Sequence, residues 1–102
     1  MNSNRYLSPA DRPVVDGLEA HEVVYAKNQP EYNPLRTLRS NTKECRVLSR
    51  WSPTPEQRQA LAEGADIFLE LLTFGNPLQP ILMSVGEMGT EFVRESFKLP
   101  TA

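Results

Sequence analysis

The chain has few of the residues on which most catalytic and metal sites depend. Its 102 residues include one cysteine, Cys45, and one histidine, His21, and its five glycines form no phosphate-binding loop. A disulfide within the chain would need a second cysteine. A zinc site would need two carboxylates in addition to Cys45 and His21. His21 lies between acidic residues, as solvated histidines often do. The sequence therefore predicts no metal, no cofactor and no enzyme activity.

Long apolar runs and a strong net charge are also missing. No run approaches the roughly 18 apolar residues of a membrane span. The first residues, MNSNRYLSPADRP, lack the charged-then-apolar order of a signal peptide. Eleven basic and thirteen acidic side chains leave a net charge of −2, so no overall field attracts nucleic acid. We expect an intracellular protein without a membrane partner.

Prolines, by contrast, are abundant, and nine of them favour short elements over a helix bundle. Residues 1–20 show no periodicity, and Pro9 and Pro13 exclude a continuous helix there. This stretch is predicted to be an extended N-terminal arm. The remaining residues, 21–102, are long enough for a single small domain.

Short strands are predicted in the first half of that domain. Residues 22–27 are apolar and β-branched at their centre, and residues 35–40 are predicted to form a second short strand. Residues 45–51 alternate, which places Cys45 and Trp51 on one face of a third strand. Cys45 is expected to be a small core residue, with a reactive thiol as the alternative.

Helix signals are clearest between Thr54 and Gly64. Thr54 can cap a helix, Pro55 fits the first helical position, Gln57 completes a capping box and Gly64 suits the residue after the helix. A helix is therefore expected at about 55–63. A second, amphipathic helix is expected at about 91–98. Its apolar side is predicted to contain Phe92, Val93 and Phe97, with Met88 one turn earlier and Thr90 as a cap.

The stretch LLTFGNPLQPILMSVG, residues 71–86, follows a run that is apolar on both faces except at Glu70. We interpret residues 66–74 as a central strand covered on both sides. The Gly-Asn-Pro sequence would turn the chain into a returning strand, which Pro80 restricts to an edge or a bulge. The predicted fold is therefore α+β, with a mainly antiparallel sheet of about four to five strands and two short helices.

Two surfaces are candidates for binding. Residues 36–50 contain five basic side chains against one acidic one, and with Trp51 as a stacking plane they would suit a nucleotide or a single strand. The alternative is a solvated sheet face with salt bridges to the acidic helix. The basic candidates besides Lys43 are Arg36, Arg39, Arg46 and Arg50.

The proline-rich turns NQPEYNP and GNPLQP provide the other candidate surface. Stiff turns lose little entropy when they bind, so adjacent turns would form a rigid patch for a protein partner. The candidate residues are Gln29, Tyr32, Asn76 and Gln79. The alternative is that both turns only set the register of the strands.

Three blocks, YAKNQPEYNPL (25–35), LSRWSPTPEQR (48–58) and LLTFGNPLQPI (71–81), occur in this order in the chain. Together they resemble a recurrent group of small uncharacterised proteins encoded by tailed bacteriophages and prophages. The resemblance implies no activity. It implies a source: a phage product that acts in the host cytoplasm or is built into a virion.

Three functions from different classes follow. The first is a non-enzymatic accessory protein that binds a host protein, in host takeover or interference with bacterial defence. The second is a minor structural or decoration protein of the virion, whose N-terminal arm would become ordered on assembly. The third is a binder of a nucleotide or nucleic acid through residues 36–50, which the net charge disfavours. Self-association is possible in each case.

Overall fold

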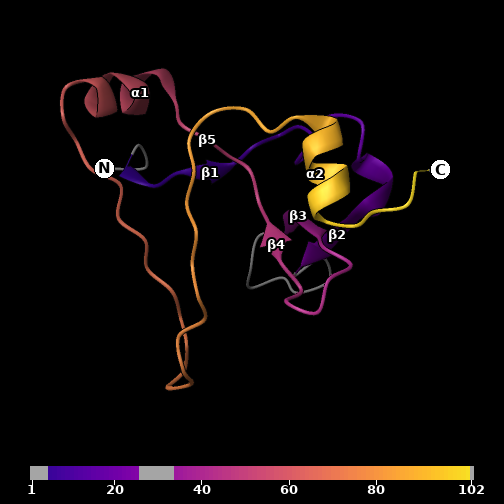
Figure 1. The fold of residues 1–102 in the computed structure, drawn as a ribbon. Helices are drawn as coiled ribbons and strands as arrows, with labels where there is room; N and C mark the ends of the chain where they lie inside the picture. Colours follow the sequence, from indigo (N-terminus) through magenta and orange to yellow (C-terminus); the bar gives the residue numbers. More distant parts are fainter. Residues whose placement is uncertain (1–4, 26–33, 102) are drawn as a thin grey trace.

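The computed structural model describes residues 5–25 and 34–101 of the chain (Figure 1). It confirms a small α+β fold with antiparallel strands in two sheets. The first sheet contains three strands and the second contains two. The elements are β1 (Ser8–Pro9), a 3-10 turn (Glu19–His21), β2 (Glu22–Tyr25), β3 (Leu35–Arg39), β4 (Val47–Leu48), β5 (Trp51–Ser52), α1 (Pro55–Ala62) and α2 (Thr90–Ser96).

The three-stranded sheet has the order β2-β3-β4, and β1 pairs with β5 in the two-stranded sheet. The single strand predicted over residues 45–51 is wrong, because β4 and β5 belong to different sheets. Cys45 lies in a tight turn instead, with a positive φ of 51° and its N–H 3.0 Å from the Thr42 carbonyl oxygen. Its side chain is exposed, so the expected core position is wrong as well.

The core lies between β3, α2 and the segment that precedes β2. Apolar residues from these distant parts of the sequence pack in one cluster: Val14, Val15, Leu18, Leu38, Val93, Phe97 and Leu99. Residues 14–18 thus contribute to the core although they precede the domain boundary expected at residue 20. Thr37 is buried beside them, and its Oγ1 donates to the Val23 carbonyl oxygen at 2.6 Å, which satisfies the hydroxyl.

The first helix, α1, confirms the capping signals. The Thr54 side chain accepts from the Gln57 N–H, and the Gln57 side chain accepts from the Thr54 N–H. Gly64 follows with a φ of 106°, and the N–H of Gly64 and of Ala65 bond back to Leu61 and Ala60 in a Schellman motif. No residue of α1 is buried, so its tertiary contacts are weak.

The second helix, α2, is held much more firmly. Val93 and Phe97 are buried as expected, but Phe92 is 67% exposed and does not belong to the apolar side. Gly89, not Thr90, is the N-cap residue. Thr90 Oγ1 donates instead to the Asp16 carbonyl oxygen at 2.6 Å. The helix is therefore fastened to the segment before β2.

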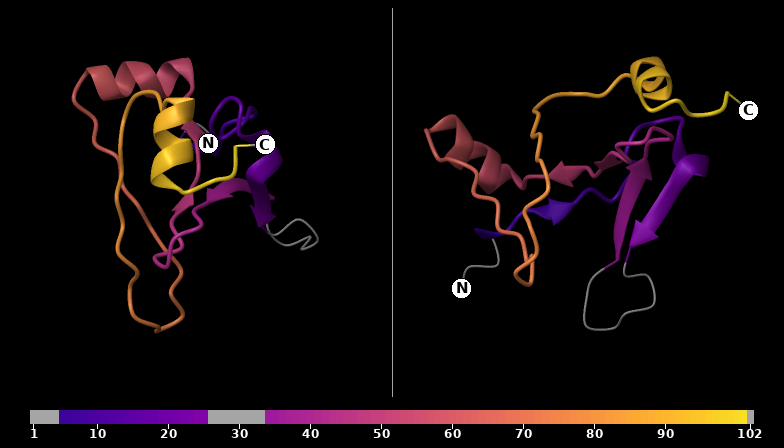
Figure 2. Two further views of the ribbon diagram at one scale, coloured as in Figure 1. Left: turned by 45° about the vertical axis from the view of Figure 1, so that its right-hand side comes forward. Right: turned by 60° about the horizontal axis from the view of Figure 1, so that its bottom comes forward.

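Residues 65–88 run out from the end of α1 in one extended length and return to the start of α2 in another (Figures 1 and 2). We call residues 65–73 the outgoing limb and residues 76–88 the returning limb. Neither limb contains a strand, and the apolar side chains of Ile67–Phe74 are largely exposed. The predicted central strand is therefore wrong. The seven residues of the core cluster come from other segments, and no limb residue belongs to it.

A tight turn at the tip joins the two limbs. The Asn76 N–H donates to the Thr73 carbonyl oxygen at 3.0 Å, and Phe74 and Gly75 have φ values of 53° and 85°. Positive φ at both central positions is the geometry of a type I′ hairpin turn. The chain does reverse here, but around Phe74 and Gly75 rather than Gly-Asn-Pro, and the predicted returning strand after the turn is wrong because no strand is formed there. In the register that this turn sets, Pro80 falls opposite Leu69 at a hydrogen-bonding position, where it has no N–H to donate.

The end of α2 provides a test of backbone strain. Lys98 has a φ of 57°, and the N–H groups of Lys98 and Leu99 bond to Glu95 and Arg94 in a second Schellman motif. Glycine fills this position without strain, as Gly64 does after α1. We expect Lys98→Gly to stabilise the protein by about 1 kcal/mol and to raise the Tm by roughly 4–8 °C.

Thermal unfolding followed by circular dichroism measures this change. Lys98→Ala is the control, because it removes the same charge but keeps a Cβ in the left-handed region. An equal Tm for the two variants would contradict the role assigned to the backbone.

Candidate interaction surface

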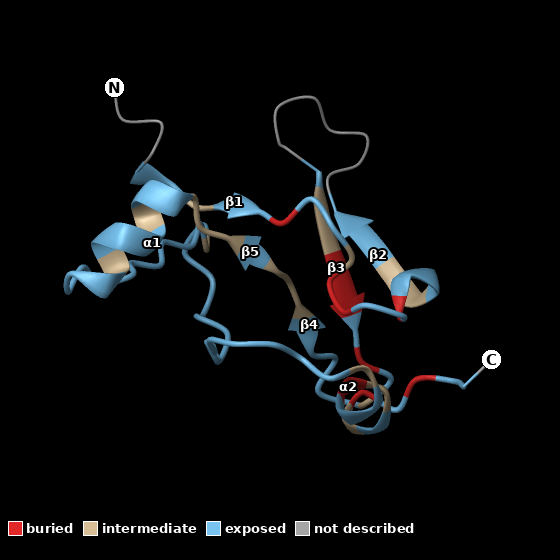
Figure 3. Cartoon of the chain, turned by 90° about the horizontal axis from the view of Figure 1, so that it is seen from above, coloured by how far each residue is buried: buried red, intermediate tan, exposed pale blue. Residues whose placement is uncertain are grey.

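The limbs carry a large exposed apolar surface. Between Ile67 and Val85 the only charged side chain is Glu70. Figure 3 shows the limbs almost wholly in the colour of exposed residues, whereas the buried residues cluster around β3 and α2. We call the most exposed apolar side chains, which are 64–96% exposed, the limb surface: Phe68, Leu72, Phe74, Leu78, Leu82 and Val85.

Exposure along each limb follows a period of two. The neighbouring apolar residues Ile67, Leu69, Leu71, Ile81 and Met83 are only 44–56% exposed, and they alternate with members of the limb surface. Extended chain points successive side chains to opposite sides, so this alternation is what two extended limbs produce. Both sides of the limbs are apolar, and both keep contact with water.

The backbone of the limbs is also free to pair. Among the described residues, the hydrogen bond from Asn76 to Thr73 is the only one that joins two backbone groups within residues 66–88. Extended chain with unpaired N–H and C=O groups is a template for another strand. The limbs thus combine apolar side chains with free backbone groups, which is the combination that strand pairing between chains uses.

Only the second of the two proline-rich turns lies wholly within the described residues. Gln29 and Tyr32 lie outside the described residues. Asn76 and Gln79 are exposed, with Asn76 in the turn and Gln79 on the returning limb. The second turn is therefore part of the limbs, and its polar residues are neighbours of the limb surface.

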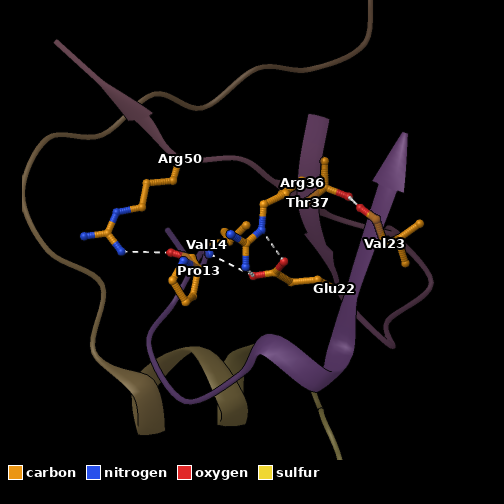
Figure 4. Close-up of polar contacts among 7 residues, drawn as sticks. All are labelled: Pro13, Val14, Glu22, Val23, Arg36, Thr37 and Arg50. Atoms are coloured by element: carbon orange, nitrogen blue, oxygen red, sulfur yellow. Dashed lines mark hydrogen bonds and ion pairs between the residues drawn. The ribbon is translucent and has the colours of Figure 1, made fainter. Parts of the chain in front are cut away.

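The Glu22 carboxylate organises the basic side of the sheet (Figure 4). Its Oε1 accepts from Arg36 Nε at 2.7 Å, and its Oε2 accepts from Arg36 NH2 at 3.1 Å and from the Val14 N–H at 3.0 Å. Glu22 is well buried, with a side chain that is 8% exposed. The hydrogen bond from Arg36 to this carboxylate raises the pKa of the guanidinium. One carboxylate thus joins β2, β3 and the segment before β2.

The other basic residues also contact their own chain. Arg50 NH1 donates to the Pro13 carbonyl oxygen at 2.9 Å and lies 3.6 Å from the Asp16 carboxylate. Arg46 lies over the ring of Phe97, 4.7 Å from its centroid. These contacts fit the expected alternative of a salt-bridged surface. The acidic partners are Glu22 and Asp16, however, and not residues of the helix at Pro55–Ala62.

Arg39 and Trp51 do not join these groups into one site. Arg39 NH2 donates to Cys45 Sγ at 3.3 Å, and this hydrogen bond raises the pKa of the guanidinium. Arg39 is three residues from Arg36 on β3, so the two side chains leave opposite faces of the strand. Trp51 is exposed on β5, with its indole N–H donating to Ser49 Oγ at 2.9 Å.

Metal and membrane sites receive no support from the geometry. In the part of the chain that the structure describes, no three His, Cys, Asp or Glu side chains come together as metal ligands. The helices described there are also too short and too polar to cross a membrane. His21 is the last residue of the 3-10 turn and precedes Glu22 in the sequence. It is half-buried.

No family model, curated protein or solved structure matches the chain. The comparisons therefore transfer no function to it. The chemistry of the limb surface itself is the evidence for its role. Sequence reasoning assigned these same residues to the core; the two prolines that follow the turn, Pro77 and Pro80, are the signal that a buried sheet is not formed there.

The Glu22 contacts generate a prediction about stability. Glu22→Gln leaves Arg36 without a charged partner and weakens the hydrogen bond to Val14, so we expect a clear fall in Tm. Arg12→Gln is the control, because Arg12 forms an exposed ion pair of 3.6 Å with Asp16. This control should change the Tm by only about 0–4 °C, because an exposed ion pair contributes little. Equal Tm values for the two variants in a thermal melt would contradict the role of Glu22.

Proposed function

We propose that the chain is a small non-enzymatic protein that acts by binding another protein chain through the limb surface. The observation that carries this proposal is the exposure of six large apolar side chains on one 18-residue stretch, 68–85. Exposed apolar patches of this kind mark interaction sites on soluble proteins. The only charge among them is Glu70, so the contact would depend on apolar burial rather than on ion pairs.

The partner we put first is a bacterial host protein, bound in the host cytoplasm. Two observations support a phage protein in this role. The three sequence blocks resemble small phage and prophage proteins, and the third block, residues 71–81, coincides with the tip of the limbs. An accessory protein that interferes with a host process needs a stable scaffold and one binding surface. The core around β3 and α2 provides the scaffold, and the limbs provide the surface.

A virion protein is the second candidate partner. The observation that favours it is the exposure of apolar side chains on both sides of the limbs. Permanent assemblies bury larger and more apolar surfaces than reversible complexes do. A minor structural or decoration protein of the virion would have its limbs covered permanently by its neighbours.

Binding of nucleic acid has less support. Arg36, Arg46 and Arg50 contact groups of their own chain, and the limb surface contains no cation. Phosphate recognition needs several cations that are free to approach the backbone of the nucleic acid. The limbs, not the arginines, are therefore the surface to test first.

Leu82→Lys tests the proposed function. Leu82 is 88% exposed, so a lysine there should leave the Tm unchanged, whereas an unpaired ammonium buried in an apolar interface is costly. We expect a protein that the wild-type chain captures from bacterial lysate to be recovered at least about tenfold less with Leu82→Lys. Quantitative mass spectrometry of the captured proteins measures this loss.

Ala62→Lys is the matched control, since it adds the same charge at an exposed position of α1. It should capture the partner as the wild type does. Equal capture by Leu82→Lys and the wild type would contradict the limb surface as the binding site. Mass spectrometry of purified phage particles separates the two candidate partners, because abundant copies in the particle would favour the virion.

A further inference from the structure

The chain exposes more surface than a folded monomer of its size should. Its accessible surface is 8488 Å², whereas a compact monomer of 11.5 kDa exposes about 5,800 Å². Its radius of gyration is 15.2 Å, compared with about 13 Å for a compact chain of this length. The excess surface is about 2,700 Å² by this scaling. The extended limbs, whose apolar side chains are 44–96% exposed, contribute to this excess.

That excess, on one chain, is slightly more than one chain buries in a typical obligate interface. Obligate homodimers bury about 2,000–5,000 Å² in total, or about 1,000–2,500 Å² on each chain. A partner that covered the limbs would have to offer an apolar surface just as large. A second copy of the chain offers that surface, and a twofold arrangement covers the limbs of both copies at once.

Charge is compatible with a second copy. The net charge of the whole chain is only −2, and the charged residues of each outgoing limb are Asp66 and Glu70. Two copies therefore repel each other weakly. Acidic side chains directly opposite each other would still be unfavourable, so the twofold axis must lie away from residues 66, 68 and 70.

The prolines decide which limb can form a ladder between copies. The returning limb contains Pro77 and Pro80, which interrupt the row of N–H donors. The outgoing limb, residues 65–73, contains no proline, and its backbone groups have no backbone partner within the limbs apart from the Thr73 carbonyl at the turn. Its alternating exposure shows that it is already extended as a strand would be.

We propose that two copies of the chain associate through their outgoing limbs, which form an antiparallel ladder about a twofold axis. The apolar side chains of both limbs then pack between the copies. The inference rests on the proposed function for its surface. It makes a second copy the chain that covers the outgoing limb, and it leaves the returning limb, with Leu82, for the partner of the proposed function.

Sedimentation equilibrium of the purified full-length chain tests this inference, at concentrations from about 1 to about 100 µM. We expect a mass twice the 11.5 kDa of one chain. Glu70→Pro removes one donor from the edge of the outgoing limb that faces away from the returning limb, and it should weaken the dimer at least about tenfold although it also removes a repulsive charge. Ser84→Pro is the matched control on the returning limb, and it should dimerise as the wild type does.

A second variant guards against a folding defect of Glu70→Pro. Leu72→Lys keeps every backbone donor of the outgoing limb and places an ammonium among the apolar side chains, so it should also be monomeric. Circular dichroism of each variant checks that the helices remain. A wild-type chain that is monomeric at every concentration would overturn the inference, as would equal weakening by Glu70→Pro and Ser84→Pro.

The outcomes separate this inference from the proposed function. A wild-type chain that is monomeric alone, yet loses its captured protein with Leu82→Lys, would retain the proposed function and overturn the dimer. A chain that dimerises through its outgoing limb, with no captured protein that depends on Leu82, would support the dimer and contradict the binding of a host protein.

Discussion

The small size of the core is the constraint on which the rest of the structure depends. Seven apolar residues from the segment before β2, from β3 and from the α2 region fill the space between these elements. No residue of the apolar run that begins at Ile67 belongs to this cluster, and the side chains of the run stay largely exposed. Leaving them exposed forgoes roughly 1.5–3 kcal/mol for each large side chain, which is the free energy that a partner chain can recover.

The same core also holds one end of the limbs in place, the end at which the returning limb meets α2. The limbs start after the Schellman motif at Gly64 and end where α2 begins. In α2, which follows the returning limb, Val93 and Phe97 are buried, and Thr90 is hydrogen bonded to Asp16. In α1, which precedes the outgoing limb, no residue is buried. The returning limb is thus anchored firmly, and the outgoing limb has more freedom to adapt to a partner.

Local signals in the sequence predict the helices, and long-range packing explains what they miss. Thr54, Gln57 and Gly64 specify α1 because capping depends on neighbours in the chain. Residues 66–74 were predicted as a buried strand because an apolar run has the same composition whether it lies in a core or in an interface between chains. The burial of Val14, Val15 and Leu18 cannot be read from the sequence, because these residues show no periodic pattern. Their segment is held on the sheet by the Glu22 carboxylate, which accepts from the Val14 N–H and from Arg36, a residue distant in sequence.

Hydrogen–deuterium exchange of residues 66–73 at several protein concentrations tests the central claim most directly. The account predicts slow exchange at high concentration and fast exchange on dilution, because the N–H groups of the outgoing limb find partners only in a second chain. The core amides of β3 should exchange slowly at every concentration. Exchange of residues 66–73 that is slow and independent of concentration, or fast at every concentration, would contradict it.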